Sequence, residues 1–213
     1  MTITSWYRQA LLQAIGSGSA GNAPNFDFLS DVIKISLHTS SYTPDLDAHV
    51  FRSSLTNEVA NGNGYTTGGA TLGTKAASYV PAASATARAN STAYTLGQLR
   101  RPASSNGYVY QVVVAGTSGG SEPTWPTVVG TTVTDGGVTW LCAGRGYIMF
   151  DAADPSWANA TITARYAVIY DDTPATDAAK PLLWLIDFES NVSSTNGTYQ
   201  ITFDANGIGY IAV

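Results

Sequence analysis

Apolar and polar side chains alternate most regularly between Thr161 and Tyr170, where β-branched and aromatic residues are also abundant. Both features are typical of a β-strand, and the length of the run indicates a central one. Turn residues bound it on each side, with Asp151-Ala-Ala-Asp-Pro155 before it and Asp171-Asp-Thr-Pro174 after it. We therefore take this run as the central strand around which the rest of the chain is arranged.

Further strands are predicted on both sides of this run, so the sequence indicates an all-β, sandwich-like fold. In the segment around residue 35, Ile33, Ile35 and Leu37 fall on one face, which predicts a strand with a single buried face. Asn206-Gly207 is a hairpin signal near the end of the chain. The additional predicted strands are Ser30–Thr39, residues 70–80, Tyr147–Phe150, Pro181–Phe188, Thr198–Phe203 and Ile208–Val213.

Two segments have helical spacing instead. Trp6–Ile15 places Trp6, Leu11 and Ile15 along one face and stops at a glycine- and serine-rich stretch, which predicts one short helix. It has little charge, so we expect it to pack on the sheet or on a neighbouring subunit, and these three residues are the candidate docking contacts. Asp47–Val59 predicts a weaker helix with its apolar residues facing inward.

The composition of the chain changes after residue 82, where small and polar residues become more frequent. Two hairpin signals, Asn106-Gly107 and Asp135-Gly136, lie between strand-like runs, and the pattern seen before residue 82 resumes near Gly146. We therefore predict a small β minidomain at residues 83–144, inserted into a discontinuous outer β domain formed by residues 1–82 and 145–213. An insertion at an exposed hairpin is tolerated when its ends stay close together.

Composition excludes several classes of protein. Only 12% of the 213 residues are charged and the net charge is −5, which argues against a nucleic-acid partner because binding phosphates requires clustered Lys and Arg. The single Cys142 excludes an intramolecular disulfide, and its setting predicts a buried strand position. There is no run of 18 apolar residues to insert into a membrane, and no secretory leader is expected at the start of the sequence.

Candidate catalytic and metal-binding groups are sparse. His38 and His49 have no nucleophile motif near them, and two histidines with one cysteine give no metal-ligand spacing. The carboxylate pairs Asp151/Asp154 and Asp171/Asp172 would suit glycoside hydrolysis, but they lie beside Pro or Thr, where Asp commonly caps a turn. We therefore expect no catalytic residues, no metal and no cofactor.

Several longer phrases resemble known phage proteins. The outer segments contain SDVIKISLHTSSYTPDLDAHVF, LTNEVANGNGYTTGGATL and FDAADPSWANATITARYAVIYDD, and they resemble a family of tailed-bacteriophage virion proteins found among head and tail structural genes. The resemblance covers most of Trp6–Val80 and Gly146–Val213. The insert contains AYTLGQLRRP, NGYVYQVVVAGTSGGSEPTWP and TVTDGGVTW, and it resembles a small β module of phage tail fibres, spikes and capsid decorations. It departs from that module at Gln111-Val-Val-Val114, where an aromatic residue or Cys often stands.

The resemblance of the insert implies contact with surface carbohydrate. Binding a sugar requires an aromatic face and a few polar groups, and the candidate contacts are Trp125, Tyr108, Tyr110 and Asn106. Arg100, Glu122 and Asp135 lie nearby in the sequence. Trp140 alternates with Val138 in a strand and is expected in the core, and packing over the hairpin remains the alternative for Trp125.

From the resemblance we expect a non-enzymatic virion structural protein, most simply a capsid decoration or cement protein that forms a homotrimer. Its partners would be the major capsid protein, or neck and tail proteins, together with copies of itself, and a host surface glycan would contact the insert. The alternatives are a tail knob, fibre or spike component and a carbohydrate-binding adhesin. A glycan-degrading enzyme is a more distant one.

Overall fold

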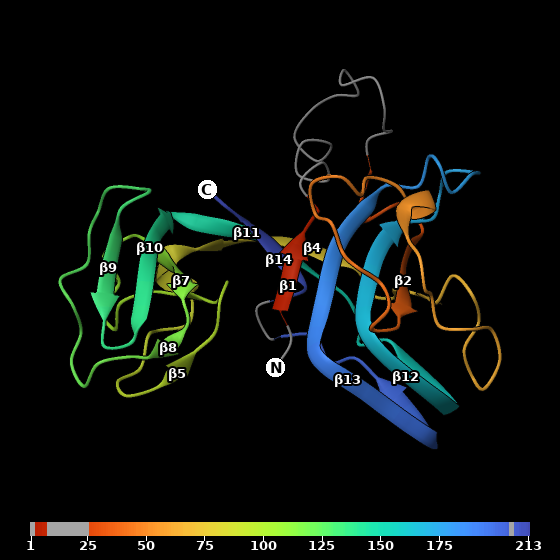
Figure 1. The fold of residues 1–213 in the computed structure, drawn as a ribbon. Coiled ribbons are helices and arrows are strands. Elements are labelled where there is room, and N and C mark those ends of the chain that lie inside the picture. Colours follow the sequence, from red (N-terminus) through yellow and green to blue (C-terminus); the bar gives the residue numbers. More distant parts are fainter. Residues whose placement is uncertain (1–2, 8–25, 205–206) are drawn as a thin grey trace. The chain divides into compact units, whose positions relative to one another are not determined.

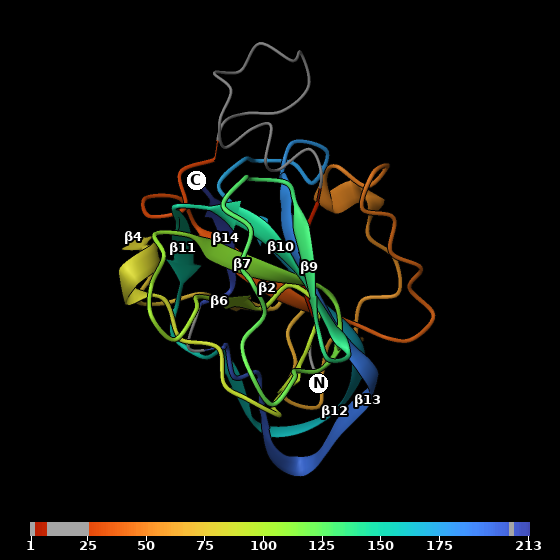
Figure 2. The ribbon, with the colours of Figure 1, turned by 90° about the vertical axis from the view of Figure 1, so that its left-hand side faces the viewer.

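The computed structural model describes residues 3–7, 26–204 and 207–213 and is drawn in Figures 1 and 2. The chain forms two compact units. Unit 1 comprises Met1–Ala76 and Asp151–Gly209, and unit 2 comprises Ala77–Phe150 and Tyr210–Val213. Nearly all the regular structure is β, which confirms the predicted all-β, sandwich-like character. Within the described residues, none of the helices has the length and hydropathy needed to cross a membrane.

Unit 1 contains one five-stranded antiparallel sheet, in the order β1-β13-β12-β2-β3. The predicted strand Thr161–Tyr170 lies inside β12, which has two neighbours on each side, so its central position is confirmed. The strands of this sheet are β1 (Ile3–Trp6), β2 (Ile33–His38), β3 (Ala70–Thr71), β12 (Ser156–Asp171) and β13 (Leu182–Gln200).

Burial along these strands changes from one half to the other. In β12, side chains alternate between exposed and buried up to Ala164, whereas Val168, Ile169 and Tyr170 are buried in succession. In β2, Ser36 and His38 are as fully buried as the isoleucines beside them. The prediction that β2 has a single buried face was therefore wrong, because the paired part of this sheet is covered on both faces.

The pairing of β12 with β13 is the longest among the described residues. It runs from Ser156 opposite Gln200 to Tyr170 opposite Leu182, with several bulges, and Figure 1 shows the two strands side by side along this length. Strand β13 contains all of the predicted strand Pro181–Phe188 except Pro181, and it also contains part of Thr198–Phe203. The polar residues between them continue the strand because the outer half of β12 supplies their hydrogen-bond partners.

The predicted N-terminal helix is not seen in the described residues. Trp6, its expected first residue, ends strand β1 and lies opposite Trp184 of β13, with the two ring centroids 4.2 Å apart. The two large rings pack against each other at an angle across paired strands, which favours the extended backbone. Leu11 and Ile15, the other candidate docking residues, lie outside the described residues.

The predicted helix at Asp47–Val59 is wrong. Only one short 3-10 turn forms there, η1 (Arg52–Ser54). The Asp45 carboxylate accepts the backbone N–H groups of Asp47 and Ala48, which closes a turn. The backbone then pairs with another segment, since Arg52 donates its N–H to the carbonyl of Lys180 at 2.8 Å. Tertiary hydrogen bonds therefore replace those of a helix.

Unit 2 is built from three small sheets, two of which appear clearly in Figure 2. A four-stranded sheet has the order β6-β7-β10-β9, a three-stranded sheet has the order β14-β11-β4, and β5 pairs with β8. Their bounds are β4 (Ala76–Pro81), β5 (Ala93–Tyr94), β6 (Leu99–Arg100), β7 (Val109–Val114), β8 (Gly116–Thr117), β9 (Thr132–Asp135), β10 (Val138–Gly144), β11 (Gly146–Asp151) and β14 (Gly209–Ala212), with a 3-10 turn η2 (Ala82–Ser84).

Of the three predicted hairpin turns, the one at Asp135-Gly136 forms as a two-residue turn between paired strands, and the other two signals lie in different settings. Asp135 lies opposite Val138 across Gly136-Gly137, and Gly136 has the positive φ of 62° that such a turn requires. Asn106-Gly107 instead lies in the longer connection between β6 and β7. Residues 209–212 do not return to β13: β14 joins β11 and β4.

Two clusters of buried side chains form the interior of unit 2. One contains Trp140 and Cys142, neither of which is exposed, so both predicted core positions are confirmed. The other surrounds Leu99, Val109 and Tyr147. With two clusters of its own, unit 2 has a substantial interior for its size.

We expect Gly69→Ala to destabilise unit 1 by about 2–4 kcal/mol. Gly69 has φ of 74°, and a Cβ there would lie 1.8 Å from the carbonyl oxygen of Ile35. The matched control is Gly73→Ala, because a Cβ at Gly73 has nothing within 4 Å. Urea denaturation followed by tryptophan fluorescence measures both variants. Equal stability of the two would contradict the close approach of Gly69 to β2.

Candidate functional site

A buried ion pair connects the loops of unit 2. The Arg88 guanidinium donates from Nε to Oδ2 of Asp135 at 2.9 Å and from Nη2 to Oδ1 at 2.7 Å. The two side chains are 0% and 1% exposed. A pair with two parallel hydrogen bonds is among the stronger ion pairs found in proteins. Arg88 and Asp135 therefore connect the segment before β5 to the end of β9.

Further polar partners surround this pair. Arg88 donates to the Asn90 side chain and, from Nη2, to the carbonyls of Gly119 and Ser121. Asp135 accepts the Gly119 N–H at 2.9 Å and the Trp140 indole N–H at 3.0 Å. Burial alone would raise the Asp135 pKa, but these hydrogen bonds and the guanidinium outweigh it and hold the pKa below its usual value.

Aromatic rings cover one face of the four-stranded sheet. Trp125, from the loop before β9, packs on Tyr110 with centroids 4.4 Å apart, and it meets Trp140 edge-on at 5.8 Å. Tyr110 and Trp140 are fully buried, whereas Trp125 is only partly covered. The loop tryptophan thus packs over the hairpin and still presents part of its ring to solvent. We call this region, with its neighbours Asn106 and Tyr108, the aromatic face.

The predicted glycan contacts lie together on this face. Asn106 donates from its side-chain amide to the Tyr110 hydroxyl at 2.7 Å, and that hydroxyl donates to the Pro126 carbonyl at 2.7 Å. Tyr108 packs against the same cluster, and its own hydroxyl accepts a bond from Arg145 at 3.1 Å. Because Tyr110 is buried, its ring supports Trp125, and the surface accessible to a ligand consists of Trp125, Tyr108 and Asn106.

Two residues missed at the sequence level complete this region. Arg145 lies over the Tyr108 ring at 5.0 Å, and its side chain is exposed. Arg88 anchors the loops beneath the face. In the sequence Arg88 lies among the small residues of TARAN, and nothing there identifies Asp135 as its partner. Nothing in AGRGY identifies Tyr108 as the neighbour of Arg145.

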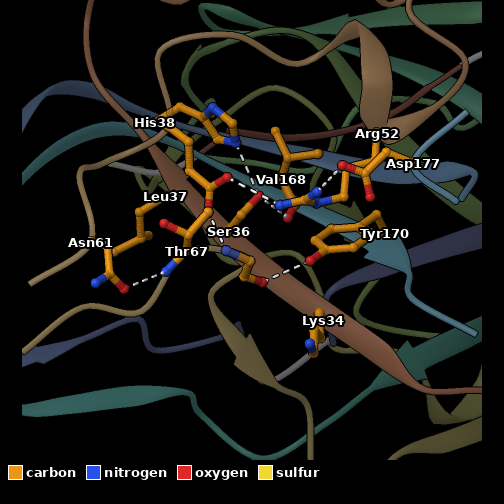
Figure 3. A network of polar contacts seen from close by, with 12 residues as sticks. Lys34, Ser36, Leu37, His38, Arg52, Asn61, Thr67, Val168, Tyr170 and Asp177 are labelled. Carbon is orange, nitrogen blue, oxygen red and sulfur yellow. Dashed lines mark hydrogen bonds and ion pairs between the residues drawn. The ribbon is translucent and has the colours of Figure 1, made fainter.

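Unit 1 holds a second polar cluster, shown in Figure 3, which contains a serine and a histidine. The Ser36 hydroxyl lies 3.0 Å from Nε2 of His38, and Nδ1 of His38 lies 2.9 Å from the Thr56 carbonyl. Neither side chain is exposed, and burial lowers the His38 pKa. A substrate could not reach this serine without opening the sheet, so the pair acts as a packed polar contact in the core.

Charged side chains extend this cluster into a chain of ion pairs. Arg52 pairs with both Asp177 and Glu58, and its guanidinium lies 5.3 Å above the Tyr170 ring. Lys180 pairs with Asp177 and with Asp172, and Asp172 also pairs with Lys34 of β2. These alternating charges attach the loop between β12 and β13 to the sheet.

The carboxylates considered as catalytic pairs bind backbone or basic side chains. Asp171 and Asp154 accept the N–H groups of Thr173 at 2.8 Å and Phe203 at 2.9 Å. Asp151 accepts the N–H of Ala152. Burial raises the Asp171 pKa, and that residue is only 1% exposed. Asp172, one residue beyond the end of β12, pairs with Lys34 and Lys180.

No cluster of three or more His, Cys, Asp or Glu side chains suited to a metal ion occurs in the part of the chain that the structure describes. Comparison with protein-family models, with curated proteins and with solved structures found no match to this chain.

We expect Asp135→Asn to destabilise unit 2 by about 3–5 kcal/mol, because it leaves the buried Arg88 guanidinium without a counter-charge. The control is Glu122→Gln, a change at an exposed carboxylate of the same unit that should alter stability by less than about 0.5 kcal/mol. Denaturant unfolding at neutral pH compares the two variants. Similar losses in both would contradict the role of the ion pair.

The same ion pair predicts a pH dependence. Since the folded state lowers the Asp135 pKa, the carboxylate contributes stability that is present above the unfolded pKa of about 4 and is lost as pH falls through the lower folded value. Wild type should therefore lose stability relative to Asp135→Asn as pH falls below about 4. Unfolding curves collected between pH 7 and pH 2 test this, and a constant difference between the two proteins would contradict it.

Proposed function

We propose that the chain is a non-enzymatic structural protein of a tailed-bacteriophage particle, most simply a capsid decoration protein. Unit 1 would dock on the particle and unit 2 would carry a surface that contacts the host. The observation that supports this best is the inserted second unit, which has its own core, a buried ion pair and one partly exposed aromatic face. A display module needs a self-supporting fold of this kind.

The outer half of the β12–β13 pair supports docking by unit 1. β1 pairs with β13 only up to Asp187, and beyond that residue no other described strand pairs with this edge of β13. From Ser190 to Gln200 the strand is uncharged and largely exposed. Monomeric proteins usually protect such an edge with Lys, Pro or a covering loop. An unprotected edge favours pairing with a neighbouring subunit of a lattice.

Copy number tests the proposal. Quantitative mass spectrometry of purified particles compares this protein with the major capsid protein. We expect a ratio near one, or near a simple fraction set by lattice symmetry. A ratio of a few per cent would instead favour the alternative of a neck, tail knob, fibre or spike component. Absence of the protein from particles would overturn the structural role altogether.

The aromatic face favours a second function, binding of a host surface glycan. Pyranose rings pack their C–H faces on aromatic side chains while nearby polar groups bind the hydroxyls. Trp125 and Tyr108 offer partly exposed rings, and Asn106 is an exposed amide next to them. This function is compatible with a place on the head or on the tail, and it would be the main activity of an adhesin.

We expect Trp125→Ala to reduce binding of the full chain to host cells at least tenfold, because it removes the accessible ring. Trp125→Phe retains a ring and should keep most of the binding. It also removes an indole N–H that is buried without a hydrogen-bond partner among the described residues, which offsets part of the packing lost with the smaller ring. Val128→Ala, at an exposed residue of the same loop, is the control. Unchanged binding in Trp125→Ala would contradict the glycan function.

A further inference from the structure

The aromatic face belongs to a unit whose charge is opposite in sign to that of the rest of the chain. Unit 2 contains four arginines, no lysine, one aspartate and one glutamate, so its net charge is +2. Unit 1 contains six basic and thirteen acidic residues, so its net charge is −7. The net charge of the whole chain is therefore negative although the net charge of unit 2 is positive.

The two carboxylates of unit 2 are both engaged within the unit. Asp135 is buried against Arg88, and Glu122 accepts the Ala103 N–H at 2.6 Å. In contrast, Arg100 and Arg145 form no ion pair with any residue that the structure describes. Four basic residues of unit 1 do pair with carboxylates: Lys34, Arg52, Arg165 and Lys180.

Both unpaired arginines flank β7, the strand that carries Tyr110 of the aromatic face. Arg100 lies opposite Tyr110 in the register of β6 with β7. Arg145 follows Gly144, which lies opposite Val109 on the other side of β7. Since neighbouring strands are about 4.8 Å apart, the two backbones are separated by about 10 Å. One or two sugar rings would span that gap.

Aromatic rings position both guanidinium groups. Arg145 lies 5.0 Å from the centroid of Tyr108, and Arg100 lies 5.3 Å from the centroid of Tyr94. A guanidinium that stacks on a ring still presents N–H groups at its edge, and their geometry matches a carboxylate. Arg100 also donates from Nη1 to the Leu99 carbonyl at 2.7 Å, which leaves its other N–H groups available. Arg101 is more fully bound, because carbonyls of Ala85, Pro102 and Ala103 accept its N–H groups.

We infer that the ligand of the aromatic face is an acidic polysaccharide, whose carboxylates bind Arg100 and Arg145 while a sugar ring packs on Trp125 or Tyr108. This inference rests on the proposed glycan function. A neutral glycan would use the rings and Asn106 but would gain nothing from two unpaired cations. An acidic protein surface, including unit 1 of a second copy, would use the cations, but it would not need the exposed rings.

The test compares each polyuronate of a panel with its own methyl ester, which keeps the sugar rings and removes the charge. Biolayer interferometry on the full-length protein should show affinity at least tenfold higher for the acid form, and added salt should weaken that binding. We expect Arg145→Gln to lose about tenfold and the double variant Arg100→Gln/Arg145→Gln about a hundredfold in affinity for the acid. Both variants should lose much less affinity for the ester than for the acid.

Two further variants distinguish the guanidinium from simple net charge. Arg165→Gln removes the same charge from unit 1 and should leave binding unchanged, while Arg145→Lys keeps the charge and should recover only part of the affinity. Equal affinity for acid and ester would overturn the acidic ligand but leave the neutral-glycan function standing. Binding to neither form of any member would overturn both.

Sedimentation of the same variants tests the competing partner. Salt-sensitive self-association that Arg145→Gln abolishes, without any change in polyuronate binding, would identify a second copy as the partner and overturn the inference. Self-association that is independent of Arg145, together with selective loss of polyuronate binding in Arg145→Gln, is the result we expect.

Discussion

The antiparallel pairing of β12 with β13 is the constraint on which unit 1 depends. The two strands are 16 and 19 residues long, well beyond the usual five or six. One half of the pair belongs to the five-stranded sheet, and the other half is an exposed two-stranded ribbon. At the sheet end, β1 and β2 add to their outer edges and large side chains are buried on both faces. In the ribbon, Ser and Thr side chains take the place of the large apolar ones. The hydroxyl oxygens of Thr163 and Ser193, for example, lie 2.8 Å apart across the two strands.

Unit 2 uses a different means of organisation, because its strands are short. Loops make up much of it, and loop backbone that leaves water must find hydrogen-bond partners. The Arg88–Asp135 pair supplies them at several points at once, since it binds Asn90, Gly119, Ser121 and the Trp140 indole. One buried charge pair thus fixes the loops that support the aromatic face. A unit with so few charged residues keeps two of them in its interior.

The alternation of apolar and polar residues predicted those strands and turns that depend on their own residues alone. Thr161–Tyr170 and Ile33–His38 are strands because their own side chains alternate, and Asp135-Gly136 turns because glycine accepts a positive φ. The failures depend on partners distant in the chain. Trp6 is extended because Trp184 lies opposite it, and the polar stretch of β13 is a strand because β12 accompanies it. The candidate ring residues were identified by type, but the stacking of Arg145 on Tyr108 joins residues 37 positions apart and left no local trace.

The chain crosses between the two units three times, after Ala76, after Phe150 and after Gly209. After the third crossing, β14 pairs into the sheet of β11 and β4. This order has a consequence for synthesis on the ribosome. β4 and β11 leave the exit tunnel well before β14, so one edge of β11 stays open while the whole of β12 and β13 is made. During that interval the N–H of Gly146 lacks its final acceptor, the carbonyl of Val213. Unit 1 can complete its sheet first, and unit 2 closes only when β14 arrives, which couples the completion of unit 2 to the synthesis of unit 1.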